Sequence, residues 1–175
     1  MGAGRLTAAL AATVLLVVAG CDDATTVEPP ATGSGVVARV NDGDTLTLEG
    51  GAKIRLVQVD APELTTDCFG RDARAGRDEG GEHVARVHLV RDPALDDRDT
   101  YGRLLRYVVA GETDVNVELV VRGAASPYFF RNERGMHAKE LLDAVDEARD
   151  GRRGFWGACP DARLNTGLGA LTGPA

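Results

Sequence analysis

The sequence has few cysteines, no surplus of basic residues and no apolar run long enough for a membrane-spanning helix. Its three Cys and three His are not clustered, which excludes a zinc site built from closely spaced Cys and His. The net charge is −7, which excludes a broadly basic surface that binds nucleic acid by nonspecific attraction to phosphate. Any activity on nucleic acid must therefore come from a local site, helped by a bound cation.

The N-terminal segment, residues 1–20, predicts export. Arg5 is its only charged residue and precedes an apolar run at residues 6–18, shorter than the roughly 20 residues of a membrane-spanning helix. The sequence VAGC at residues 18–21 then resembles the lipobox of bacterial lipoproteins, in which the cysteine becomes the lipidated N-terminus. We therefore expect a cleaved signal peptide, lipid on Cys21 and attachment to the extracytoplasmic face of the cell membrane. The alternative is an ordinary signal peptide whose cysteine carries no lipid.

Two cysteines, Cys68 and Cys159, remain after Cys21 is assigned to lipid. Exported proteins form disulfides, so two thiols in that compartment predict one bond between them. In the chain-entropy account, closing so long a loop would stabilise the fold by about 4 kcal/mol. The alternative is two independent buried thiols.

The composition divides the chain into a tether, one folded domain and a tail. Hydrophobic residues make up 43% and charged residues 27% of the chain, which is typical of a globular protein. Residues 21–35 and 161–175 are rich in Thr, Pro, Ala and Gly without apolar periodicity, so we expect a flexible tether and a disordered tail. Residues 36–160 are expected to form the domain.

The first half of that domain predicts strands and the second half predicts a helix. Five short strands with Gly-rich joints favour an α+β fold with a small Greek-key barrel of the OB type. Apolar residues at three- and four-residue spacing predict a helix over residues 136–150. Residues 114–123 are ambiguous, because four valines favour a strand whereas Asp114 and Gly123 are typical of a helix cap and stop. The predicted strands are residues 36–40, 45–49, 53–59, 82–90 and 104–110.

Carboxylates gather at the turns that join these strands. Asp44 follows the Asp-Gly turn after the first strand, and Asp60 and Glu63 follow the third strand. Carboxylate oxygens suit a hard cation such as Ca²⁺, and Asp44 and Asp60 could meet at one end of neighbouring strands. The structural alternative is that Asp-Gly is a common hairpin turn and Pro-Glu a common exit from a strand.

The two acidic segments, residues 40–45 and 55–63, occur together with Tyr101-Gly102-Arg103, and this combination resembles the thermonuclease, or staphylococcal nuclease-like, family. The similarity runs over about residues 36–159, and the remaining cysteine pair is similar to that of exported bacterial members. The resemblance implies a five-stranded OB barrel with three helices. It also implies that the ambiguous residues 114–123 form a helix. The segment at residues 70–76 departs from the family, because it lacks the leucines usual in the first helix.

The resemblance also implies roles for individual residues. Asp44 and Asp60 would bind Ca²⁺ through their side chains and Ala61 through its backbone carbonyl, at a position where the best-known members carry Thr. Arg55 and Arg103 carry planar forked donors suited to non-bridging phosphate oxygens.

Three further roles follow for the water and the substrate. Glu63 is placed to orient or deprotonate the attacking water. Tyr101 is placed to hydrogen-bond a phosphate, and Tyr128 or Phe129 to stack on a base. For these last two aromatic residues, filling of the core is an equal alternative.

The activity expected from the resemblance is calcium-dependent hydrolysis of DNA and RNA phosphodiesters by a monomer, with release of the 5′ oxygen and formation of 3′-phosphate ends. The competing hypothesis is a noncatalytic OB-fold surface lipoprotein that binds single-stranded nucleic acid or a protein partner.

Overall fold

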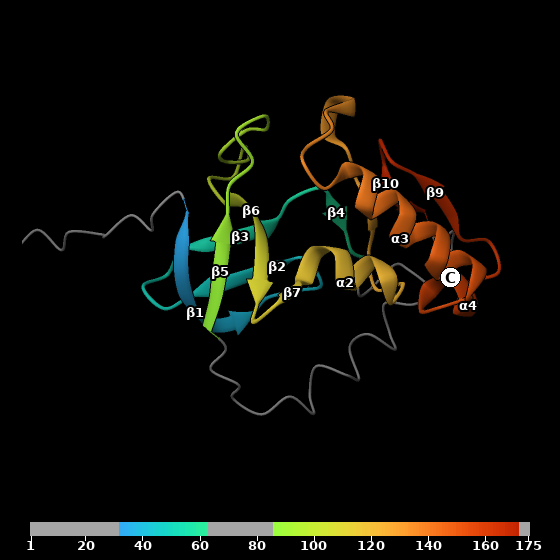
Figure 1. Cartoon of the computed structure of the whole chain (residues 1–175), viewed down its shortest axis with the longest axis horizontal. Helices are drawn as coiled ribbons and strands as arrows, with labels where there is room; N and C mark the ends of the chain where they lie inside the picture. The colour runs from blue at the N-terminus through green and yellow to red at the C-terminus, as the bar shows by residue number, and fades with distance from the viewer. Residues whose placement is uncertain (1–31, 63–85, 172–175) are drawn as a thin grey trace, which may run out of the picture.

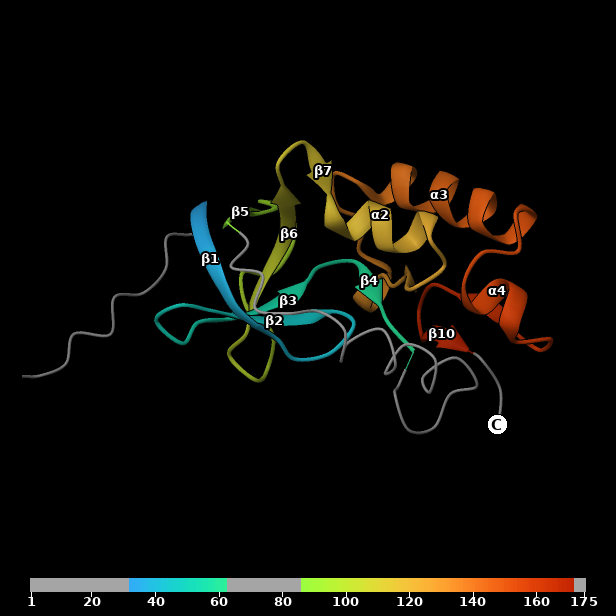
Figure 2. The same cartoon turned by 90° about the horizontal axis from the view of Figure 1, so that it is seen from below.

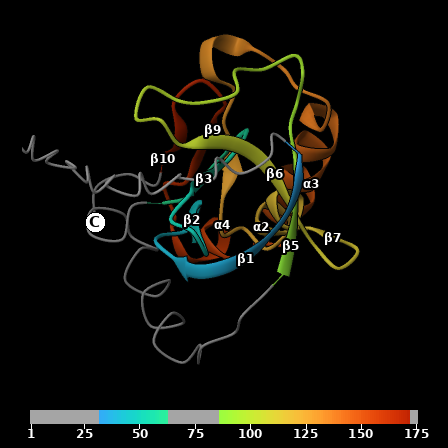
Figure 3. The same cartoon turned by 90° about the vertical axis from the view of Figure 1, so that its left-hand side faces the viewer.

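Five strands from the first two-thirds of the chain form a closed barrel (Figure 1). The computed structural model describes residues 32–62 and 86–171. Each strand of the barrel is hydrogen-bonded to two neighbours, in the order β3-β2-β1-β5-β6, and β6 closes the ring on β3. The ring is visible in Figure 3. Its strands are β1 (Gly33–Val40), β2 (Thr45–Leu48), β3 (Lys53–Leu56), β5 (Arg86–Val90) and β6 (Leu104–Ala110).

Closure of the barrel depends on one parallel pairing, which joins Ile54 of β3 to Leu104 of β6. The pairs β1–β2, β2–β3, β1–β5 and β5–β6 are antiparallel. Ile54 and Leu104 are both buried, as expected for strands whose alternate side chains face a closed interior. The prediction of an α+β fold with a five-stranded OB barrel is confirmed.

The helices lie together on one side of the barrel, as Figure 1 and Figure 2 show. In the described residues they are α2 (Val115–Val121), α3 (Ala138–Asp150), α4 (Phe155–Ala158) and the short 3₁₀ helix η1 (Phe130–Asn132). The ambiguous segment is a helix because Asp114 caps it, accepting hydrogen bonds from the N–H groups of Asn116 and Val117. The helix predicted over residues 136–150 is confirmed, with its first turn two residues later.

Apolar residues from the strands and helices form one core. The interior of the barrel continues into the contact of α2 with α3, so the helices extend the core rather than cover a separate one. The largest buried apolar side chains include Ile54, Leu89, Phe129, Leu141 and Phe155.

The segment predicted as one strand over residues 53–59 is two short strands. β3 ends at Leu56, and Gln58 then adopts φ 61°, a left-handed conformation incompatible with an extended strand. The chain turns there into β4 (Val59–Asp60), which pairs with β8 (Ser126–Pro127). This break directs Asp60 away from the line of β3.

Both ends of the domain differ from the prediction. β1 begins at Gly33, which pairs with Leu89 of β5, so the last three residues of the expected tether belong to the barrel. The tail expected to be disordered contains a hairpin of β9 (Arg163–Asn165) and β10 (Gly169–Leu171). The carbonyl of Thr166 accepts a hydrogen bond from the N–H of Phe129 at 2.6 Å, a tertiary contact that composition does not display.

Several predictions concern residues that the structure does not describe. They are the signal peptide, Cys21, Glu63, Cys68 and the beginning of the strand predicted over residues 82–90. Within residues 32–62 and 86–171, no helix is both long enough and apolar enough to cross a membrane.

Candidate active site

Asp44 and Asp60 meet at the guanidinium of Arg55. Arg55 Nε lies 3.1 Å from Asp44 Oδ1, and Arg55 Nη2 lies 3.0 Å from Asp60 Oδ1. The Asp-Gly turn before β2 presents Asp44, the pairing of β2 with β3 places Arg55 opposite Thr45, and the break at Gln58 brings Asp60 back. The structure therefore brings together three residues that the sequence analysis selected from two separate segments.

Asp44 is held from both sides and is largely buried. Its Oδ2 accepts a hydrogen bond from the N–H of Ala61 at 3.0 Å, and its Oδ1 accepts one from Thr45 Oγ1 at 3.1 Å. A Cβ at Gly43 would lie 2.5 Å from Ala61 Cβ, so the turn needs glycine for this close approach. Burial raises the pKa of Asp44 above its usual value, although Arg55 and the Ala61 N–H act in the opposite direction.

Arg55 is turned inward and organises the two carboxylates. Its Nη1 donates hydrogen bonds to the carbonyls of Leu56 and Val59, each at 2.6 Å. Together with the ion pairs to Asp44 and Asp60, these contacts involve all three nitrogen atoms of the guanidinium. The side chain is only 13% exposed. The sequence predicts that Arg55 binds two phosphate oxygens at once. Such bidentate binding would require the guanidinium to release one of these contacts.

Arg103 is the more available forked donor. Its Nε lies 2.6 Å from Asp99 Oδ2, and its Nη1 donates to Thr45 Oγ1 at 3.1 Å. The two N–H groups of Nη2 have no partner within the described part of the chain. The guanidinium also lies 5.5 Å from the centroid of the Tyr101 ring. Arg103 can therefore contact an incoming anion without losing the bonds that position it.

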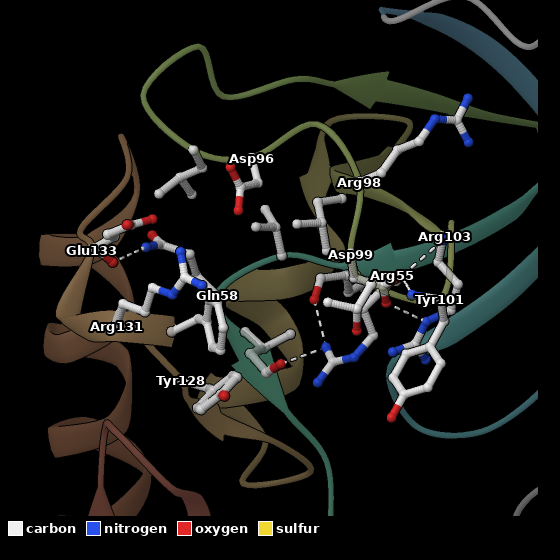
Figure 4. A pocket seen from close by; sticks show the side chains of 17 residues that line it. Arg55, Gln58, Asp96, Arg98, Asp99, Tyr101, Arg103, Tyr128, Arg131 and Glu133 are labelled. Carbon is white, nitrogen blue, oxygen red and sulfur yellow. Dashed lines mark hydrogen bonds and ion pairs between the residues drawn. The ribbon is translucent and has the colours of Figure 1, made fainter.

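A cavity of about 290 Å³ opens beside the two arginines (Figure 4). Figure 4 shows Tyr101 and Tyr128 on opposite sides of Arg55. Tyr101 is 85% exposed and lies at the rim, whereas Tyr128 is half-buried in the wall.

Of the two alternatives for Phe129, stacking on a base and filling of the core, the structure shows the second. Its ring is 0% exposed in the hydrophobic core, so it cannot meet a substrate base. Phe130 lines the cavity instead and is 50% exposed.

Three residues that the sequence analysis did not select shape the site. Thr45 and Asp99 bind Arg103, and both stand within four residues of a selected residue, which was the available signal. Gln58 is buried in the wall of the cavity, accepts a hydrogen bond from Tyr107 Oη at 2.9 Å and donates one to the carbonyl of Glu133 at 3.0 Å. The sequence around Gln58 does not indicate that it belongs to the site, because its hydrogen-bond partners, Tyr107 and Glu133, lie far along the chain.

The family model described as Staphylococcal nuclease homologue matches residues 53–158. The chain belongs to this family. It is 34% identical over 139 residues to Endonuclease YhcR of Bacillus subtilis (strain 168), a match that covers 70% of this chain but 11% of that protein. It is 33% identical over 134 residues to Protein ParB of Escherichia coli, covering 70% of this chain and 71% of that protein. It is 27% identical over 128 residues to Thermonuclease of Staphylococcus hyicus, covering 69% and 73%.

The donor atoms of this staphylococcal nuclease homologue suit a hard cation. Asp44 and Asp60 bring carboxylate oxygens to the same guanidinium, that of Arg55, and the N–H of Ala61 donates a hydrogen bond to Asp44. The two carboxylates and Arg55 leave one net negative charge, which a divalent cation would reverse. Among the described residues, no group of three or more His, Cys, Asp or Glu could hold a metal ion. Ca²⁺ also accepts carbonyl and water oxygens as ligands.

Proposed function

We propose that this protein is a calcium-dependent, sugar-nonspecific nuclease that hydrolyses phosphodiester bonds in DNA and RNA. The observation that carries the proposal is the convergence of Asp44 and Asp60 on Arg55, with Arg103 joined to the same network through Thr45. Membership of the staphylococcal nuclease homologue family and relatives named endonuclease and thermonuclease support it.

The proposed chemistry assigns neutralisation of the phosphate charge and activation of the water to different groups. A phosphodiester is anionic, so hydrolysis needs neutralisation of charge, an activated water and stabilisation of the charge that develops at phosphorus. Calcium held by Asp44, Asp60 and the Ala61 carbonyl supplies positive charge to the phosphate when bound. Arg103 grips the non-bridging oxygens with its Nη2 donors. Glu63, in the segment that follows Ala61, orients or deprotonates the water.

The products follow from which bond breaks. Attack of the water oxygen on phosphorus with breakage of the bond to the 5′ oxygen leaves a 3′-phosphate end and a 5′-hydroxyl end, and the leaving oxygen takes up a proton. This polarity is part of the proposal and rests on family membership. Identification of the termini by end-labelling of the products tests it.

The cavity beside the arginines is proposed to hold the nucleotide. Tyr128 in the wall and Tyr101 at the rim offer a ring and hydroxyl groups to a base and a phosphate. Base–aromatic stacking contributes about 1 to 3 kcal/mol per base and tolerates any sequence. Such contacts suit a nuclease that does not select its site by base identity.

The test of the nuclease proposal measures acid-soluble nucleotides released from DNA and from RNA, with calcium and with a chelator. We expect release only with calcium, and a loss of about 100-fold or more for Arg103→Ala, the scale of losing one donor to a developing anion. Arg122→Ala is the control, because its side chain is 72% exposed at the end of α2 and it is not among the residues that line the cavity. Activity that persists in the chelator, or in Arg103→Ala combined with Glu63→Ala, would refute the proposal.

Export with a lipid anchor on Cys21 is also proposed, from the apolar run and lipobox at the N-terminus. The protein would then act at the extracytoplasmic face of the membrane. Cys21→Ser should release the processed chain from the membrane fraction. A variant chain that stays in the membrane fraction would rule out the lipid anchor.

The disulfide between Cys68 and Cys159 is a separate proposal that follows from export. Cys159 is 2% exposed at the end of α4, which suits a sulfur that needs no solvent contact. Mass spectrometry of a nonreduced digest should recover the two cysteines in one linked peptide. Recovery of both as free thiols would exclude the bond.

A further inference from the structure

The C-terminal hairpin reaches the candidate metal site. β10 contacts both β4 and β8, and Figure 2 shows it beside β4. The hairpin is anchored where Thr166 accepts the N–H of Phe129 at 2.6 Å. Its turn is exposed, and Leu168 is 67% exposed, but the next residue, Gly169, is buried. Gly169 is therefore a buried residue directly after an exposed turn.

The residue against which Gly169 packs is Asp60. A Cβ at Gly169 would lie 2.8 Å from Asp60 Cγ and would overlap Asp60 Oδ2. Real side chains do not approach this closely, so only glycine lets the hairpin backbone lie against the carboxylate. Gly169 also has φ 83°, a left-handed conformation that favours glycine.

Among the residues that the structure describes, Arg55 and Gly169 lie on either side of the Asp60 carboxylate. Oδ1 lies 3.0 Å from Arg55 Nη2, and Oδ2 faces the backbone of Gly169. Arg55 is itself fixed by four contacts and cannot follow a displaced carboxylate without losing one of them. A rotation of the Asp60 side chain is therefore opposed on both sides.

We propose that the C-terminal hairpin, residues 163–171, sets the orientation of the Asp60 carboxylate and thereby the affinity of the site for calcium. Gly169 is a positioning residue, because it acts through Asp60 and not on the substrate. The inference rests on the proposed calcium dependence. It extends the site to a part of the chain beyond residues 53–158, over which the family model matches. Groups that orient a ligand typically change metal affinity about 10- to 100-fold.

The test compares Gly169→Ala with Gly51→Ala in the full chain. Gly51 has φ 87° but nothing within 4 Å of an added Cβ, so it reproduces the backbone strain without the contact. It lies at the turn of the β2–β3 hairpin, at the opposite end from Thr45 and Arg55. Gly169→Asn is a second variant, because Asn tolerates a positive φ better than Ala and still adds the Cβ.

Calcium binding is measured by isothermal titration calorimetry, and DNA hydrolysis is measured at saturating calcium. We expect both Gly169 variants to raise the calcium Kd about 10-fold or more, and Gly51→Ala to leave it unchanged. High calcium should restore most of the hydrolysis rate of the Gly169 variants. Circular dichroism confirms that each variant is folded.

The outcomes separate this inference from the proposed function. A wild-type chain that binds calcium and cuts DNA, with unchanged affinity in folded Gly169 variants, overturns the inference alone. Equal weakening in Gly51→Ala overturns it too. Calcium binding that depends on Gly169 without hydrolysis by the wild type supports the inference and refutes the nuclease. A wild-type chain that binds no calcium overturns both.

Discussion

Arg103 Nη1 donates a hydrogen bond of 3.1 Å to the hydroxyl of Thr45, a residue 58 positions earlier in the chain. The same hydroxyl donates to Asp44 Oδ1, also at 3.1 Å. Thr45 thus links the proposed phosphate-binding arginine to a proposed calcium ligand. Because the hydroxyl is an acceptor from one charged group and a donor to the other, it satisfies both at once.

Thr45→Val tests this link with a side chain of nearly the same shape. We expect the rate of DNA hydrolysis to fall about 2- to 10-fold, because a hydrogen bond contributes about 0.5 to 1.5 kcal/mol net. Thr47→Val is the matched control on the same strand, where the lost bond is to Asn41 and not to the site. The steady-state rates of DNA hydrolysis by the two purified variants at saturating calcium are compared with the rate of the wild type. Equal losses in the two variants would show that the link has no role of its own.

Asp99 makes the free energy of unfolding depend on pH in the acid range. Burial raises the pKa of Asp99, but hydrogen bonds from the Arg103 side chain and from the N–H groups of Arg103 and Tyr101 outweigh this effect and hold the pKa below its usual value. A carboxyl with a lowered folded pKa stabilises the fold above its unfolded pKa, and the contribution disappears as pH falls through the folded pKa.

Asp99→Asn should therefore lower the free energy of unfolding at pH 7 by about 1 to 3 kcal/mol, the scale of hydrogen bonds to a charged group. The difference between wild type and variant should narrow below about pH 4. Urea denaturation at several pH values measures the free energy of unfolding of both proteins. Asp96→Asn, an exposed change on the same loop, is the control. A gap between wild type and Asp99→Asn that stays constant down to pH 2 would contradict the assignment.

Asn116 joins α2 to the barrel through two backbone groups. Its Oδ1 accepts the N–H of Val108 at 3.0 Å, and its Nδ2 donates to the carbonyl of Val57 at 2.8 Å. Asn116→Ala leaves both groups buried without these partners, at a cost of about 1 to 3 kcal/mol each. We expect the free energy of unfolding to fall by about 2 to 5 kcal/mol. Asn165→Ala, an exposed change at the end of β9, should lower the free energy of unfolding by less than about 1 kcal/mol, and comparable losses in the two variants would be inconsistent with this role of Asn116.

The parts of the fold that the sequence predicted depend on local pattern. The helix α3 repeats apolar residues at helical spacing, and β6 is apolar or aromatic at every position except Arg106. The parallel pairing of Ile54 with Leu104 could not be predicted from such a pattern, because it joins segments 50 residues apart. The hairpin at residues 163–171 was not predicted for the same reason, because it is held by a backbone hydrogen bond to Phe129, which is far away in the sequence.

The resemblance to a family predicted which residues form the candidate site. It did not predict which groups each of these side chains contacts. Asp44 and Asp60 contact Arg55, and Arg103 joins them through Thr45. That Arg55 is occupied by two carboxylates and two carbonyls follows from the positive φ of Gln58, which bends the chain back over the guanidinium. No single-residue propensity indicates that bend, since glutamine is not a typical turn residue.

Phe129 and Phe130 are adjacent and should behave in opposite ways. Phe129 is 0% exposed in the core, so Phe129→Ala should lower the free energy of unfolding by about 3 to 5 kcal/mol. Phe130 is 50% exposed and lines the cavity, so Phe130→Ala should leave stability nearly unchanged.

If Phe130 stacks on a base, its removal should weaken binding of a single-stranded oligonucleotide by about 1 to 3 kcal/mol. Fluorescence anisotropy with a labelled oligonucleotide measures the binding, and urea denaturation measures the stability. The conservative change Phe130→Tyr, which keeps an aromatic ring, should bind as the wild type does. Because the two neighbours separate stability from binding, a loss of binding in Phe130→Ala without a loss of stability assigns the ring to the substrate. Unchanged binding would assign it to the surface alone.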